Sequence, residues 1–183
     1  MKKLKKIGKK IVFGALFCVF AGAVSFAQSE SSLAFQMQDA YDSGFYPGVV
    51  LYADQILNSE SKSVYEAKAM VLKGESLFKM GRIKDSLEIL SDAEKSAKNS
   101  PELNSARCFW TGRGLFELNK NEAALPYFYK SAEILKNAGL EKTSVYSQAI
   151  LYSGKTLVRL KKFEAAADCF EYAVQNGKKF SAG

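Results

Sequence analysis

The chain contains no histidine. This absence excludes general acid–base catalysis by histidine, Ser-His-Asp triads and imidazole metal ligands. The sequence also has no glycine-rich phosphate loop, no cysteine pair with metal-ligand spacing and no pair of acidic residues set apart by its spacing. We therefore expect a protein that is not an enzyme and that has no metal site and no cofactor.

Cysteine is scarce. Cys18 lies in an apolar N-terminal run, which leaves Cys108 and Cys169. Both fall at apolar positions of helical segments, which favours small buried side chains. A disulfide between them stays open, because the sequence cannot establish the distance between two different helices.

Acidic residues are absent before Glu30, whereas six lysines lie among the first ten residues. The lysines precede an apolar run, 11–26, which is shorter than the roughly 20 residues of a membrane-spanning helix. Small residues, Ser25 and Ala27, flank Phe26 where a signal peptidase would cut. The pattern predicts a bacterial secretory signal over 1–27, cleaved after Ala27, and a periplasmic or cell-envelope protein without a membrane span. Retention of the signal as an anchor is the minor alternative.

The net charge of +7 belongs to that leader. Without its six lysines, residues 28–183 carry a net charge of +1. No basic face of the kind that binds phosphate backbones remains, so we expect no nucleic-acid partner.

A pattern of twenty residues occurs three times, at 74–93, 112–131 and 154–173. Each copy has a glycine, a leucine three residues later, a polar turn, a small residue, and an apolar residue four positions further on. Apolar residues at three- and four-residue steps share one face of a helix. Small residues allow two helices to cross closely. Each copy therefore predicts two packed helices.

These copies resemble the tetratricopeptide repeat, a helix–turn–helix unit that stacks on its neighbours. The resemblance implies an all-α, right-handed superhelical array over residues 28–183, with protein partners. The repeats are expected at about 33–59, which is a weak copy, and at 66–98, 102–138 and 144–178. The glycines are 38 and 42 residues apart, against the family's 34, which indicates longer helices.

About eight helices follow from this division. In the weak copy, Gln38 takes the place of the glycine and Val49 that of the small residue, and the match is one residue short in the turn. The second copy predicts helices over 64–80 and 82–98. Ser100 and Thr143 or Ser144 are expected to cap later helices, while Pro126 predicts a late start or a kink in the helix from about Glu122.

The candidate binding site is the groove that stacked first helices would line. Its inner positions combine apolar residues with charges that turn from acidic to basic along the chain. This pattern suits an extended or helical peptide. The alternative, equally weighted, is that the apolar members pack between helices. The expected contact residues are Val71, Glu75, Phe78, Phe109, Arg113, Phe116, Leu151, Lys155, Val158 and Arg159.

The function expected from these features is an exported protein-interaction scaffold, in assembly of the bacterial cell envelope or of surface complexes. The alternatives are a structural or oligomerisation spacer and an accessory repeat domain of a larger envelope protein or enzyme. The last helix reads FEAAADCFEYAV, so its outer face could also support a homo-oligomer. Binding of a chaperone C-terminus is disfavoured, because Val71, Glu75 and Trp110 stand where that subtype needs lysine and asparagine.

Overall fold

The computed structural model describes residues 29–59 and 63–181, and every regular element in those ranges is a helix. The predicted secretory signal lies outside the described residues. The helices are α2 (Glu30–Asp42), α3 (Tyr46–Leu57), α4 (Glu66–Lys79), α5 (Ile83–Asp92), α6 (Glu94–Ala97), α7 (Pro101–Glu117), α8 (Asn121–Asn137), α9 (Ser144–Arg159) and α10 (Phe163–Ser181). Within these ranges, no helix has the length and apolar character that crossing a membrane requires.

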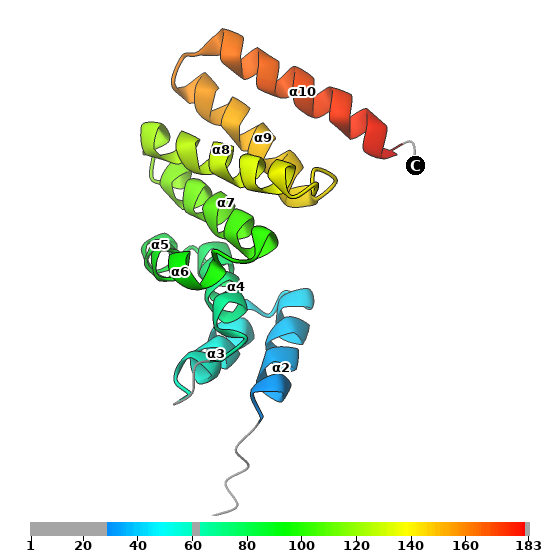
Figure 1. Cartoon of the computed structure of the whole chain (residues 1–183). Coiled ribbons are helices and arrows are strands. Elements are labelled where there is room, and N and C mark those ends of the chain that lie inside the picture. The colour runs from blue at the N-terminus through cyan, green and yellow to red at the C-terminus, as the bar shows by residue number, and fades with distance from the viewer. Residues whose placement is uncertain (1–28, 60–62, 182–183) are drawn as a thin grey trace, which may run out of the picture.

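The helices form four antiparallel pairs that stack in chain order, with α2 and α10 at opposite ends of the stack (Figure 1). We call α2, α4, α7 and α9 the first helices. The second helices are α3, α5 with its short continuation α6, α8 and α10. Each first helix contacts the next first helix as well as its own partner. The first helices therefore share one side of the stack, which we call the first-helix face. The predicted all-α repeat array is confirmed.

One residue in each hairpin turn has a positive φ, a conformation that glycine adopts most easily. These residues mark the same place in every pair, so equivalent positions in successive pairs differ by 37, 38 and 42 residues. They are Gly44 (74°), Gly81 (78°), Asn119 (57°) and Lys161 (59°).

The turns correct the register expected for the weak first copy. Met37, and not Gln38, is the equivalent of Gly74, because each lies seven residues before its positive-φ residue. The first turn is therefore not shorter than the others. Met37 is fully buried, so a long flexible side chain fills the space that the glycines leave open in later pairs.

The helices of each later pair cross closely at the repeated glycine. A Cβ atom on Gly112 would lie 2.8 Å from the ring of Phe128, and one on Gly154 would lie 2.6 Å from the ring of Phe170. In the second pair, the Ser86 hydroxyl donates a 2.7 Å hydrogen bond to the carbonyl of Gly74. The close crossing predicted from the small residues is thus present.

Helix ends differ from the expectation in two places. The helix expected over 82–98 is broken at Ala93, whose ψ of −5° separates α5 from α6. Pro126 lies inside α8, which begins at Asn121 and so does not start late. Two expected caps are confirmed, because the hydroxyls of Ser100 and Thr143 accept from the amides of Leu103 and Tyr146.

Both described cysteines are free thiols. Cys108 lies on α7 and Cys169 on α10, and these two helices do not contact each other. The disulfide alternative is therefore excluded. Burial raises the pKa of both thiols.

Candidate partner-binding surface

Four cations on the first-helix face lie over aromatic rings. They come from three successive first helices, α4, α7 and α9, whose order along the stack is visible in Figure 1. We call them the cation row, which consists of Lys79, Arg113, Lys155 and Arg159.

Arg113 is the centre of the row. The guanidinium carbon lies 4.1 Å from the ring centroid of Tyr152 and 4.9 Å from that of Phe78, so it sits between rings of two neighbouring first helices. Trp110 contributes a third ring at 5.6 Å. Stacking of this kind holds a guanidinium in one orientation while its edge nitrogens stay directed outward.

The polar contacts of Arg113 leave part of its donor capacity unused. One terminal nitrogen lies 3.6 Å from a carboxylate oxygen of Glu117, and the side chain is 17% exposed. The buried Nε has no hydrogen-bond partner among the described residues.

At the N-terminal end of the row, Lys79 adjoins a buried carboxyl group. The Lys79 ammonium lies 5.3 Å from the Trp110 ring centroid and 4.0 Å from a carboxylate oxygen of Glu75. The Tyr41 hydroxyl donates a 2.7 Å hydrogen bond to Glu75. Burial raises the pKa of Glu75, although Tyr41, Lys79 and Trp110 all act to lower it. Burial also raises the pKa of Tyr41, and its bond to Glu75 adds to this shift.

At the C-terminal end, two cations of α9 lie over rings in different ways. The ammonium of Lys155 is 4.6 Å from the ring centroid of Tyr152, and its side chain is exposed. The guanidinium of Arg159 lies 3.5 Å from the ring centroid of Phe116 and donates a 2.7 Å hydrogen bond to the Phe116 carbonyl. Lys155 is therefore available to a partner, whereas Arg159 also joins α9 to α7.

The structure divides the expected contact residues by exposure. Lys155, Val158 and Arg159 are exposed, and Phe78, Arg113 and Leu151 are partly buried. The remaining four are buried, with exposed fractions of 1% for Val71, 7% for Glu75, 1% for Phe109 and 7% for Phe116.

Phe109 and Val71 were expected to form part of an apolar column in the groove, and this expectation is wrong because both are buried. Phe109 packs with Leu90 and Phe128 in the main core cluster, and Val71 packs with Ala93 and Ala97 of a second helix. The helices are rotated so that these positions face the second helices and not the open side. For Phe109 and Val71, the alternative therefore applies: they pack between helices.

Sequence reasoning missed the aromatic residue that matters most on this face, Tyr152. It lies two residues before Gly154, as Trp110 lies two before Gly112, so the repeat itself contained the signal. Trp110 is 7% exposed, in keeping with the expectation that it packs in the core. Its ring also borders the row, so it is both a packing residue and a neighbour of two cations.

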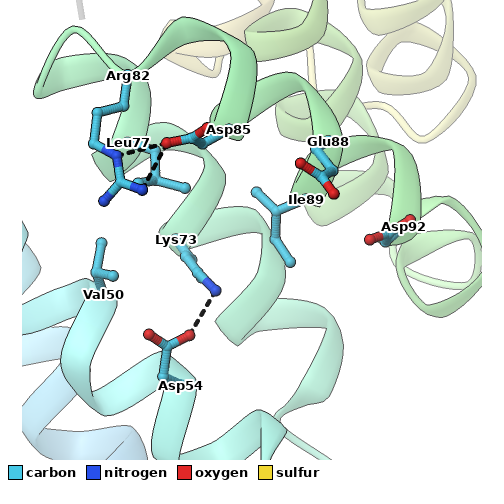
Figure 2. A pocket seen from close by; sticks show the side chains of 9 residues that line it. All are labelled: Val50, Asp54, Lys73, Leu77, Arg82, Asp85, Glu88, Ile89 and Asp92. Carbon is cyan, nitrogen blue, oxygen red and sulfur yellow. Dashed lines mark hydrogen bonds and ion pairs between the residues drawn. The ribbon is translucent and has the colours of Figure 1, made fainter.

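A separate pocket of about 390 Å³ lies between α3, α4 and α5. Figure 2 shows two ion pairs in its wall, Lys73 with Asp54 at 2.5 Å and Arg82 with Asp85 at 2.6 Å. Both cations are thus already neutralised, and the carboxylates of Glu88 and Asp92 complete an acidic rim. Across residues 29–59 and 63–181, no cluster of three or more His, Cys, Asp or Glu side chains could hold a metal ion.

Comparison with solved structures gives a match of the whole stack. The chain is similar to the crystal structure of BtubC (BKLC) from P. vanneervenii, with 13% sequence identity and a TM-score of 0.55 over 86% of this chain. The described fold is a tetratricopeptide-like helical repeat array. The array spans 59% of the length of BtubC, and at this identity the likeness concerns the fold alone. No protein-family model and no curated protein sequence matches the chain.

Proposed function

We propose that this protein is an exported interaction scaffold that binds an acidic segment of a partner protein along the cation row. Helical repeat arrays of this type commonly bind other proteins along the surface that their stacked repeats form. The observation that carries the proposal is the stacking of all four cations over aromatic rings on one face. Export rests on the predicted signal of residues 1–27 and sets the cell envelope as the place of action.

Charge balance supports an acidic partner. Residues 28–183 carry a net charge of only +1, yet four cations gather on three adjacent helices of one face. Two acidic residues contact the row, Glu75 beside Lys79 and Glu117 beside Arg113, which leaves Lys155 and Arg159 without an acidic contact. The uncompensated charge of this face is therefore positive, which attracts carboxylates and orients their approach.

The side chains of the cation row are already held in place, which supports a specific contact with a partner and not only long-range attraction. Lysine and arginine normally lose considerable side-chain freedom on binding. Here the rings of Phe78, Tyr152 and Phe116 already restrict three of the four cations. A partner carboxylate would meet groups that are in place, and flanking apolar residues of the partner would contact the partly exposed ring edges.

The single tryptophan provides the test. Trp110 borders Lys79 and Arg113, so we expect its fluorescence to change when a short Asp- and Glu-rich peptide binds. The double substitution Lys79→Glu and Lys155→Glu should weaken binding about tenfold or more at low salt, where the screening length is about 30 Å. The matched control, Lys84→Glu with Lys130→Glu, makes the same charge change at exposed positions of α5 and α8.

A lysine-rich peptide of the same length should leave the fluorescence unchanged. Equal loss of binding in the control pair would mean that net charge, and not the cation row, attracts the peptide. Binding of the acidic peptide that is insensitive to both double substitutions would reject this surface.

A further inference from the structure

The two ends of the repeat stack leave open the positions through which its internal pairs contact one another. At two of the three contacts between successive first helices, the later helix presents an aromatic side chain to the one before it, whereas in α4 the equivalent residue is Leu72. The ring centroids of Trp110 and Phe78 are 5.1 Å apart, and those of Tyr152 and Phe116 are 5.7 Å apart.

The equivalents of these partners at the two ends are exposed. Counting back from the hairpin turns, the equivalent of Trp110 and Tyr152 in α2 is Phe35, which is 73% exposed. The equivalent of Phe78 and Phe116 in α9 is Val158, which is 43% exposed. One end thus has the aromatic side chain, and the other end has the apolar position that receives it elsewhere.

The second helices show the same difference between positions that are covered inside the stack and equivalent positions that are exposed at its end. Leu87 of α5 packs so closely on α7 that a Cβ atom at Gly114 would lie 2.8 Å from it. Further along the second helices, Ala132 of α8 is 7% exposed, whereas its equivalent in α10, Val174, is 56% exposed. Phe163, at the start of α10, is 63% exposed. The face that α8 buries against α9 is therefore open on α10.

Charge also differs between the ends. The first helix at one end, α2, contains three acidic residues and no lysine or arginine, whereas α9 and the turn after it, 144–162, contain four basic residues and no acid. Helix α10 contains both signs, with three acidic residues and two lysines. The sign of the charge on the last residue of each first helix alternates along the stack. These residues are Asp42, Lys79, Glu117 and Arg159.

We propose that a second copy of this chain docks head to tail, with its α2 packed on α9 and α10 as though it were the next first helix. Phe35 of one copy then contacts Val158 of the other, and Asp42 follows Arg159, which continues the alternation of charge. A second copy fits better than an unrelated helix, because its α2 has the aromatic side chain that the apolar position of α9 lacks and acidic residues that complement the basic residues of α9. The contact is heterologous, so it produces growing chains and not closed dimers.

Mixing of two variants tests the proposal. Phe35→Asp disables one end and Val174→Asp the other, and both side chains are exposed, so both variants should fold. Tyr129→Asp, at a 46% exposed position in the middle of the stack on α8, is the matched control. Sedimentation velocity would be measured on the full chain and on the chain from Gln28, over about a hundredfold range of concentration.

We expect the wild type and the control to gain mass with concentration, less so at high salt, in both forms of the chain. Each end variant alone should associate about tenfold or more weakly, the usual effect of losing an interface anchor. An equimolar mixture of Phe35→Asp and Val174→Asp should form 1:1 dimers that do not grow, because one intact head meets one intact tail.

Four outcomes would overturn the proposal. They are a wild type that stays monomeric throughout, a Phe35→Asp variant that associates normally while Val174→Asp does not, a mixture that forms no dimer, and association that requires residues 1–27. The second outcome would indicate pairing of α10 with α10, and the last would indicate that residues 1–27 themselves mediate the association.

Discussion

Glu75 shows at the level of a single residue how the array tolerates a carboxyl group in its interior. The side chain is 7% exposed, accepts a hydrogen bond from Tyr41 and lies 4.0 Å from the ammonium of Lys79. These contacts stabilise the ionised form, yet burial dominates and raises the pKa. The folded protein therefore binds a proton at Glu75 more tightly than the unfolded chain does.

This raised pKa has a defined effect on stability. The contribution of Glu75 is largest below its unfolded pKa of about 4.3 and is lost as the pH rises through the higher folded value. Glu75→Gln, which resembles the protonated acid, should match the wild type near about pH 4 and exceed its melting temperature increasingly up to about pH 7.5. Thermal melts of both proteins at several pH values would measure this difference.

Glu133→Gln, at an exposed position of α8, is the control for replacing any carboxyl group by an amide. A melting-temperature difference for Glu75→Gln that shrinks as the pH rises would contradict the assignment, since it would mean that the charged form is the stabilised one.

Phe109 separates packing from binding. It is 1% exposed and packs in the core beside Phe128 and Trp110. Phe109→Ala should lower the free energy of unfolding by about 3–5 kcal/mol, the usual range for truncating a buried aromatic side chain. Lys155→Ala should change it by less than about 0.5 kcal/mol, because surface substitutions normally do. Urea unfolding of both variants checks this contrast, and equal small effects would place Phe109 on the surface.

The sequence could predict which residue types gather on the first helices, but not which of them are exposed. Helical spacing places Phe109 and Arg113 on one face, since they are four residues apart. Whether a given position on that face is covered depends on the rotation of the helix against two neighbours. Phe128 of the partner helix α8 and Tyr152 of the next first helix α9 help to determine this rotation, so the periodicity within α7 alone does not specify it.

At the level of elements, the hairpin turns were the most predictable feature. The last of them has a strained backbone conformation. Glycine has the positive φ in the first two turns, whereas Lys161 has it in the last. A side chain with a Cβ atom is disfavoured there by about 1–2 kcal/mol. Replacing Lys161 with glycine would remove this cost from the folded state. Part of the gain in stability would be lost, because glycine makes the unfolded chain more flexible.

Lys161→Gly should therefore raise the free energy of unfolding by about 0.5–1 kcal/mol, despite the usual penalty for introducing glycine. Lys162→Gly, one residue later in the same turn and without a positive φ, should lower it. Chemical denaturation of the two variants provides the comparison. Destabilisation by both substitutions would show that the last turn does not need a left-handed residue.

Helix partnership was also predictable, whereas exact helix ends were not. The repeated glycine and small residues indicated close crossing, and the 2.7 Å bond from Ser86 to the Gly74 carbonyl shows how close it is. The sequence around Ala93 contains no glycine or proline that would have predicted the break between α5 and α6. The packing partners do not change at the break, because α5 and α6 both contact α4 and α7.

For the whole molecule, the sequence was sufficient to predict the fold and insufficient to predict the cation row. Repetition predicts a stack of helix pairs, because each pair needs neighbours to bury its apolar faces. The cation row depends instead on contacts between repeats, such as Arg113 of α7 with Tyr152 of α9. Such contacts follow only once the offset between successive first helices is known.

We expect the cation row, and not another surface, to hold an acidic partner segment. The most direct measurement is mapping of backbone and Trp110 indole NMR shifts while a short Asp- and Glu-rich peptide is added to the chain from Gln28. We predict that the shifted signals concentrate on the exposed side of α4, α7 and α9, including Lys79, Arg113 and Lys155. Shifts confined to α3, α5, α8 or α10, or scattered evenly over the stack, would contradict the account.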